Sequence, residues 1–329
     1  MKLLIVGFGF MGQTHCGNLL KMPDVEITGI IDPVLPLERL RTVKGNLQTV
    51  NLNAQDVSKI AHFTNLEEAI NQTNSDAAVI CLPTFLHESS ALMALENNLH
   101  VFVEKPFALT EEECDNMLRC AEEKQRLIAV GYVVRKSPVY CHLHETVKSN
   151  RLGKLKFLKL RRITGIPTWG NWSNPATIKA VGGSLFDLVS HDIDFARFLL
   201  GEPEKITVDP YVSSEFNGNY TSAMMHFPET LVSIEGGFVT PPGYPFSSTY
   251  KAFFEHGTIT GNSDGKCLEY DCNGKCQTVK LVNIDPYYAE MKSFIDALSR
   301  NGEIFCSGYD ASRSVKCCKE IQRQLNITN

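Results

Sequence analysis

The order of apolar and polar positions over the first 120 or so residues, and in one more strand just beyond them, predicts alternating strands and helices. Short apolar, β-branched runs are typical of buried parallel strands, and they occur at residues 2–6, 25–31, 77–82, 100–103 and 127–132. Helical stretches separate these runs, and Thr110 with Glu113 matches a capping box that opens a helix reaching about Lys124. Strands alternating with helices form parallel βαβ units, so we expect a doubly wound α/β domain.

The second half of the chain has a different pattern. Long strand-like stretches lie at residues 156–164, 205–212, 221–227, 231–240 and 249–255. One helical segment, 185–200, stands among them, and two helices at about 286–299 and 311–325 close the chain. Asn273-Gly274 indicates a hairpin in which Cys272 faces Lys275. We therefore predict an α/β domain over residues 1–122, and over 123–329 an α+β domain with a large, mostly antiparallel open sheet.

Charge and cysteine content narrow the class of protein. The chain has 329 residues, with 32 basic and 37 acidic side chains and a net charge of −5. This balance argues against nucleic-acid or anionic-membrane partners, which need a basic excess or stripe. No apolar run approaches the roughly 20 residues that span a bilayer. Eleven cysteines, an odd and scattered number, favour reduced thiols in a cytoplasmic protein.

A glycine-rich string follows the first strand and opens a helix. Residues 7–12 read Gly-Phe-Gly-Phe-Met-Gly, and Asp32 closes the next strand 20 residues beyond Gly12 (32 − 12). This context is typical of a dinucleotide site, in which the helix N-terminus carries the pyrophosphate and the acid binds the ribose. A glycine-rich turn without a ligand is the alternative. Asp32 would repel a 2′-phosphate, which favours NAD over NADP, although Arg39 or Arg41 could supply a compensating cation.

Two further motifs suit hydride transfer. Glu104-Lys105-Pro106 lies at the carboxyl end of a strand, where open α/β sheets bind ligands. Asp187 and His191 are four residues apart, so on a helix they share one face. Histidine suits removal of a hydroxyl proton near neutral pH, a carboxylate can orient it, and a lysine can stabilise negative charge on the substrate oxygen. Taken singly, each is also explained as an ordinary surface charge or contact.

In combination these residues resemble the Gfo/Idh/MocA family of oxidoreductases, which includes glucose–fructose oxidoreductase and inositol dehydrogenases. The resemblance covers almost the full length of the chain. It rests on the loop of residues 7–12, Asp32, Pro83-Thr84 with His87, Glu104-Lys105-Pro106, Gly131-Tyr132 with Arg135, and the Gly-Gly…Asp187…His191-Asp192…Asp194 signature. Val133, Val134, Val189 and Ser190 depart from the pattern of many relatives, which puts substrate contacts in doubt.

The resemblance implies a Rossmann domain, a second domain whose sheet often forms an oligomer interface, and an NAD(P)-dependent activity. The implied reaction moves a hydride between nicotinamide and a hydroxyl or carbonyl carbon of a sugar, cyclitol or related molecule. The implied catalytic residues are Lys105, His191 as acid/base and Asp187 as its support, with a cis peptide before Pro106. The implied cofactor-binding residues are Gly7, Phe8, Gly9, Phe10, Met11, Gly12, Asp32, Pro83, Thr84, His87, Glu104, Lys105 and Arg135.

Other candidates are open at this stage. Trp169, Trp172 and Tyr287 either line the substrate or simply pack. Cys267, Cys272 and Cys276 lack the partners of a zinc set, so we expect no metal. We expect a cytoplasmic homodimer or homotetramer that binds a small molecule. The alternatives are a reductase of a keto-sugar, nucleotide-sugar or dihydrodiol-like substrate, and a dinucleotide-binding sensor without catalysis.

Overall fold

The computed structural model describes residues 1–43, 52–167, 174–209, 211, 219–241, 244–300 and 302–326. They form two compact units, Met1–Tyr132 with Tyr287–Arg313, and Val133–Pro286 with Ser314–Asn329. The first unit thus includes residues 128–130, which the sequence-based boundary at residue 122 assigned to the second domain. It also takes in a segment from near the end of the chain, which a single boundary does not provide for.

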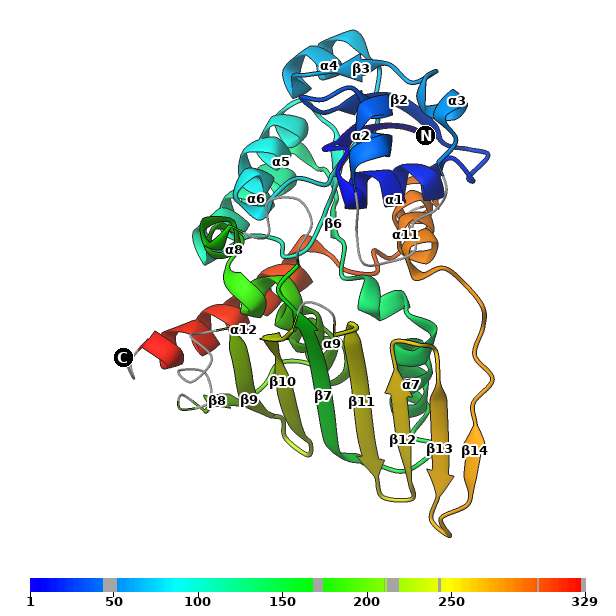
Figure 1. The fold of residues 1–329 in the computed structure, drawn as a ribbon, viewed down its shortest axis with the longest axis vertical. Helices are drawn as coiled ribbons and strands as arrows, with labels where there is room; N and C mark the ends of the chain where they lie inside the picture. The colour runs from blue at the N-terminus through cyan, green and yellow to red at the C-terminus, as the bar shows by residue number, and fades with distance from the viewer. Residues whose placement is uncertain are drawn as a thin grey trace. The chain divides into compact units, whose positions relative to one another are not determined.

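The first unit is built on a parallel sheet of six strands (Figure 1), which confirms the predicted parallel sheet. The short strand at residues 62–63 was not among the strands predicted from the sequence. The order across the sheet is β3-β2-β1-β4-β5-β6, so the direction of strand addition reverses between β1 and β4. Ligands of open α/β sheets bind at the carboxyl ends of the strands beside such a reversal. The strands are β1 (Lys2–Val6), β2 (Glu26–Ile31), β3 (His62–Phe63), β4 (Ala77–Ile80), β5 (His100–Val103) and β6 (Ile128–Val130).

Side chains cap the N-termini of three helices of this unit, from Asn53, Asn65 and Thr110. The predicted capping box is present, because Glu113 N donates to Thr110 Oγ1 at 3.2 Å and Thr110 N donates to Glu113 Oε2 at 3.0 Å. Phe8, Phe102 and Phe294 belong to one buried core cluster, which joins the sheet to the late helix α11. The helices are α1 (Phe10–Leu19), α2 (Pro36–Thr42), α3 (Ala54–Val57), α4 (Leu66–Gln72), η1 (Thr84–Leu86), α5 (His87–Glu96), α6 (Glu111–Lys124) and α11 (Pro286–Arg300).

The second unit contains an eight-stranded sheet in the order β14-β13-β12-β11-β7-β10-β9-β8. Only β7 and β10 pair in parallel among its described strands, so the prediction of a large, mostly antiparallel sheet is confirmed. The strands are β7 (Leu155–Gly165), β8 (Lys205–Val208), β9 (Tyr220–His226), β10 (Leu231–Thr240), β11 (Ser247–Phe254), β12 (Gly257–Asn262), β13 (Cys267–Asp271) and β14 (Cys276–Thr278).

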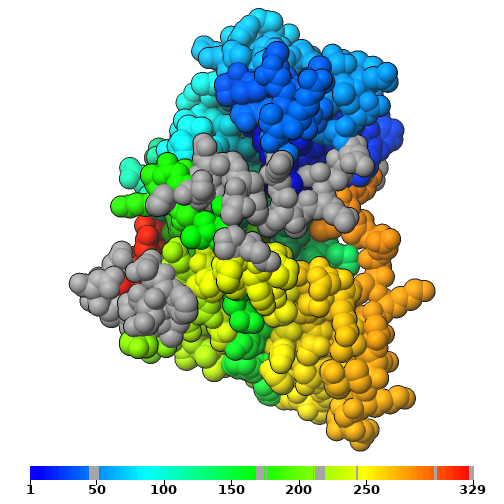
Figure 2. Space-filling view, viewed as in Figure 1, coloured from blue at the N-terminus to red at the C-terminus, as the bar shows by residue number. Residues whose placement is uncertain are grey.

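The helices α7 and α9 cover one face of this sheet. They lie behind it in Figure 1, where α9 packs on β7 and β10 and α7 packs on β12. The opposite face is exposed in the space-filling view (Figure 2). The predicted segment 185–200 consists of a π-helical turn, η3, followed by α9. The helices are η2 (Val133–Lys136), α7 (Pro138–Ser149), α8 (Pro175–Ala180), η3 (Leu185–Val189), α9 (Ser190–Leu200) and α12 (Gly308–Asn326).

The hairpin between β13 and β14 corrects the predicted register. Tyr270 lies opposite Cys276, and Asp271 N donates to Lys275 O at 3.1 Å, so Cys272 does not face Lys275. Three residues, 272–274, form the loop, and Gly274 takes the positive φ of 77° that such a loop needs. The eleven cysteines are thiols in this structure. Among the described helices, none has the length and apolar character required to cross a membrane.

Candidate active site

The glycine-rich loop joins β1 to α1 and has the geometry of a phosphate-binding turn. Gly7 has φ +90°, and a Cβ there would lie 2.7 Å from the carbonyl oxygen of Cys81. A Cβ on Gly12 would lie 2.0 Å from the carbonyl oxygen of Gly7, so only glycine lets the helix approach the strand. A Cβ on Gly9 would meet nothing within 4 Å, which leaves open space beside the N-terminus of α1. The loop therefore fits a dinucleotide pyrophosphate.

Asp32 directly follows β2 beside this loop, and its side chain is 4% exposed. Its Oδ2 accepts a hydrogen bond from Phe8 N at 2.9 Å, which ties it to the glycine-rich loop. Its Oδ1 accepts from Val34 N at 2.9 Å and from Arg39 Nε at 2.8 Å. Of the two arginines that bear on the choice between NAD and NADP, Arg39 is therefore paired with the acid, whereas Arg41 is exposed.

His87 connects two loops at the carboxyl edge of the sheet. Its ring nitrogens lie 2.9 Å from the carbonyl oxygen of Leu82, after β4, and 3.0 Å from that of Pro106, after β5. The ring is 1% exposed, and burial lowers the pKa of His87 against the opposing effect of these carbonyl contacts. His87 thus holds the two loops together. Pro83 and Thr84 were predicted, together with His87, to bind the cofactor. In the structure Thr84 is buried and Pro83 is exposed.

Glu104 and Lys105 follow β5 at the same edge. The Glu104 carboxylate is buried, with Oε1 2.6 Å from Nε2 of His15 and Oε2 accepting from Lys105 N at 3.2 Å. Lys105 is half-buried, and the peptide between Lys105 and Pro106 is cis, as the family resemblance implies. A lysine side chain therefore begins at the carboxyl edge of the sheet, where a dinucleotide binds in open α/β folds.

The second unit supplies the Asp187 and His191 pair. Gly182 and Gly183, with φ of 84° and 67°, turn the chain into η3. Asp187 lies in this π-helical turn, His191 lies in the first turn of α9, and both are half-buried. Single π turns inside helices occur often at functional sites. The sequence predicted one regular helix here because the wider turn has no distinct apolar period.

Two buried ion pairs hold the helix turn that carries His191. Arg162 of β7 donates to Asp192 from Nε at 3.1 Å and from Nη2 at 2.8 Å. Arg135 donates to Asp194 in the same bidentate way, at 2.8 Å from both nitrogens. Arg135 was predicted to bind the cofactor, whereas its guanidinium here is engaged within the second unit. Sequence reasoning missed Arg162 altogether.

The departures from the family pattern near His191 have packing explanations. Ser190 donates its hydroxyl hydrogen to the carbonyl oxygen of Phe186 at 2.6 Å, inside the wide turn. A Cβ on Gly236 of β10 would lie 2.9 Å from Cγ2 of Val189, so this glycine makes room for the larger side chain. Val189 and Ser190 are fully buried, which accounts for both residues without any contact to substrate.

The remaining predicted residues are placed as follows. Trp169 and Trp172 lie outside the described residues. Tyr287 belongs to the first unit, and its ring packs edge-on against His15 with centroids 6.2 Å apart. The one group of potential metal ligands found among the described residues is His15, Glu104 and Glu290, which sequence reasoning did not single out. His15 follows Gly12 by one helical turn, but no sequence signal connects it with Glu290.

Comparisons with known proteins cover most of the chain. A family model described as "Oxidoreductase family, NAD-binding Rossmann fold" matches residues 1–132, and the GFO/IDH/MocA C-terminal domain matches residues 140–260. A myo-inositol 2-dehydrogenase of Thermotoga maritima is 27% identical over 202 residues, 61% of this chain and 55% of that protein. An inositol 2-dehydrogenase of Arthrobacter sp. is 24% identical over 349 residues, 99% of this chain and 94% of that protein.

Solved structures show the same fold. UDP-N-acetylglucosamine 3-dehydrogenase from Acidithiobacillus ferrooxidans superposes with a TM-score of 0.80 at 20% identity, over 99% of this chain and 97% of that one. The chain spans about half the length of the first curated relatives it matches, 55% and 54%. The two family models match residues in both units of the chain, and the solved structure has the same overall fold. The chain belongs to the Gfo/Idh/MocA family of oxidoreductases, whose N-terminal domain is an NAD-binding Rossmann fold.

Proposed function

We propose that the chain is an NAD-dependent dehydrogenase that oxidises a secondary hydroxyl group of a cyclitol, sugar or nucleotide sugar. The relatives named above act on inositols and on a UDP-sugar. The observation that carries the proposal is the edge of the first sheet. There the phosphate loop, Asp32 and the Glu104–Lys105 turn follow β1, β2 and β5 of one parallel sheet.

Bound NAD would accept the hydride. The backbone of residues 7–12 and the N-terminus of α1 would hold its pyrophosphate, and Asp32 would accept hydrogen bonds from the ribose hydroxyls. The Asp32 carboxylate already accepts from Phe8 N, so its orientation is fixed before a ribose arrives. A 2′-phosphate would meet this carboxylate directly, and Arg39, which pairs with it, would have to leave it to compensate.

Lys105 and His191 would act on the substrate. The Lys105 ammonium group would donate a hydrogen bond to the substrate oxygen and stabilise its negative charge as the hydroxyl proton leaves. His191 would take that proton, and Asp187 would orient the imidazole and stabilise its charged form. In the reducing direction, His191 would give the proton to the substrate oxygen instead of taking it. A keto-sugar reductase would therefore use the same residues.

A substrate panel tests the proposal. The purified chain is mixed with inositols, aldoses or UDP-sugars and oxidised NAD or NADP, or with their keto forms and NADH or NADPH. The absorbance of the reduced nicotinamide is followed in both directions. We expect turnover of a polyol with NAD and little with NADP. Tight NADH binding without turnover of any compound would support the sensor instead.

We also propose a cytoplasmic homo-oligomer. The outer face of the second sheet carries Phe157 and Phe253, whose rings lie 6.0 Å apart, with Phe253 40% exposed. Lys159 and Glu235 lie on the same face as a 2.7 Å ion pair, so two copies related by a twofold axis would each offer both charges. Light scattering tests this, because Phe253→Glu should dissociate the oligomer if this face is the interface. The eleven thiols suit a reducing compartment.

A further inference from the structure

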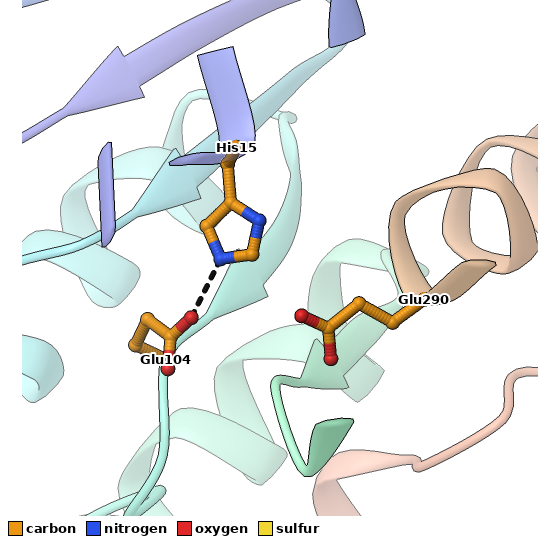
Figure 3. A group of neighbouring side chains, drawn as sticks. All are labelled: His15, Glu104 and Glu290. Carbon is orange, nitrogen blue, oxygen red and sulfur yellow. Dashed lines mark hydrogen bonds and ion pairs between the residues drawn. The ribbon is translucent and has the colours of Figure 1, made fainter. Parts of the chain in front are cut away.

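Three side chains from distant parts of the chain meet inside the first unit (Figure 3). His15 comes from α1, Glu104 follows β5, and Glu290 comes from α11. Their ligand atoms all lie within 4.8 Å of one another, and the three residues are 0%, 6% and 0% exposed. We call these three residues the His15 cluster.

The His15 cluster is built to share a proton, which distinguishes it from a metal site. His15 Nε2 and Glu104 Oε1 are 2.6 Å apart, the distance of a short hydrogen bond. Ligands about 2.0–2.2 Å from a tetrahedral zinc ion would stand about 3.3 Å from each other. An ion bound to both atoms would have to push them apart. A proton therefore lies between them, whichever of the two atoms carries it.

The surroundings fix the imidazole in place. Its ring makes edge contacts with Phe102 and Tyr287, with centroids 5.2 and 6.2 Å away. Figure 3 shows the Glu290 carboxylate pointing toward the His15–Glu104 pair. Both carboxylates also act on Cys81, because burial first, and then Glu104 and Glu290, raise the pKa of its thiol well above its usual value. Cys81 is therefore an unreactive neighbour of the cluster.

The cluster is connected to Lys105 by the main chain. Glu104 Oε1 contacts His15, while Glu104 Oε2 accepts a hydrogen bond from Lys105 N at 3.2 Å. Gly131 borders the same carboxylate, since a Cβ there would lie 3.2 Å from Glu104 Oε1. A displacement of the Glu104 carboxylate would therefore be transmitted directly to the backbone from which the Lys105 side chain extends.

We propose that His15 and Glu290 are positioning residues, which hold the Glu104 carboxylate and through it the orientation of Lys105. The proposal deepens the proposed function and rests on it only for the part that Lys105 plays in the reaction. His15 holds one oxygen of Glu104 directly. Glu290 comes from α11, and its carboxylate points toward the His15–Glu104 pair in the buried cluster.

The test measures Lys105 itself, without a substrate. His15→Gln and Glu290→Gln change the cluster with little change of volume. Gly131→Ala presses on the Glu104 carboxylate and on the Phe102 ring that packs against His15, without changing a charge. Reductive methylation with formaldehyde and a borane, read by peptide mass spectrometry, gives the labelling rate of Lys105. Lys59, with a 74% exposed side chain, is the internal reference, and Glu67→Gln on exposed α4 is the control variant.

We expect the Lys105 labelling rate to rise about threefold or more in all three variants. The half-buried Lys105 side chain becomes more accessible when Glu104 no longer holds the backbone from which it extends. Lys59 should keep its rate in every variant, and Glu67→Gln should match the wild type. On a substrate from the panel, kcat should fall by about tenfold or more while the Kd for NADH changes by less than about threefold. A general loss of structure would change both kcat and the Kd for NADH.

An unchanged Lys105 labelling rate in the folded variants overturns the proposal. If His15→Gln does not fold, Glu290→Gln and Gly131→Ala still decide it. Failure of the proposed function would give a different result. The wild type would turn over no substrate, while Lys105 would still be labelled faster in the variants. The two failures are therefore separable.

Discussion

Arg162 donates two hydrogen bonds to the Asp192 carboxylate, at 3.1 and 2.8 Å, and both side chains are almost completely buried. Asp192 directly follows His191, and Arg135 holds Asp194 in the same way two residues further along. The turn of α9 that carries His191 is thus anchored by two guanidinium groups, from β7 and from η2. This anchoring has a clear energetic consequence.

Arg162→Met should lower the free energy of unfolding by about 3–5 kcal/mol, because it leaves the Asp192 carboxylate buried without its partner. Arg162→Met combined with Asp192→Leu should recover most of this loss, since no charge remains to be buried. Urea denaturation followed by circular dichroism measures both. A double variant as unstable as the single one would show that the pair does more than neutralise a buried charge.

Gly9 and Gly12 should respond differently to the same change. Gly12→Ala places a Cβ 2.0 Å from the Gly7 carbonyl oxygen, so we expect a loss of stability of about 1–3 kcal/mol or more. Gly9→Ala meets nothing within 4 Å, so its melting temperature should match that of the wild type. Its affinity for NADH should nonetheless fall by about tenfold, because the methyl group occupies the path of the pyrophosphate. Differential scanning fluorimetry and NADH fluorescence titration separate the two effects.

Asp32 should set the choice of cofactor. In the wild type, Arg39 Nε pairs with Asp32 Oδ1 at 2.8 Å. Asp32→Ser removes the ribose-binding carboxylate and so releases Arg39. We expect the Kd for NADH to rise by about tenfold and that for NADPH to fall, since a free guanidinium can bind the 2′-phosphate. Glu38→Gln, at an exposed neighbouring position, is the matched control. Unchanged selectivity in Asp32→Ser would exclude a ribose-binding role for this residue.

His87 should make stability depend on pH. Burial lowers its pKa in the folded state below the usual 6.5, so the unfolded chain binds more protons in the interval beneath 6.5. The stabilising effect is complete above pH 6.5 and declines as the pH falls, by at most about 1.4 kcal/mol per pH unit from this one group.

Unfolding free energies between pH 5 and 8 check this, with His87→Gln as the comparison. The variant should be less stable at pH 7 but should show a shallower decline toward acid. Part of the slope will persist, because burial also lowers the pKa of His100. Equal slopes in both proteins would contradict the assignment.

The sequence predicted those parts of the fold that local pattern determines. Apolar runs and glycine positions located β1, β2, β4 and β5, and Thr110 with Glu113 correctly gave the capping box. The helix α7 was missed: its buried residues are Val139, Tyr140, Leu143 and Thr146, and polar His142 and His144 flank Leu143 in the sequence. The ring of His144 stacks on Phe198, with centroids 4.5 Å apart. The hairpin register was wrong by one residue, since Asn-Gly also suits a three-residue loop.

What the sequence did not reveal are contacts between distant segments. Arg162 and Asp192 are 30 residues apart, and Glu290 meets His15 only because α11 returns to the first sheet. Neither relationship leaves a periodic signal. Arg135 was recognised by resemblance, but only the structure shows that Asp194 occupies its guanidinium.

The most direct test of the whole account is the rate of NAD reduction by a substrate from the panel. His191→Ala and Lys105→Ala are compared with the wild type and with His256→Gln, a change at an exposed histidine. We expect both alanine variants to lose about 10²–10⁴-fold in kcat, while NADH binding by His191→Ala stays near that of the wild type and His256→Gln is fully active. Wild-type turnover by both alanine variants would contradict the account.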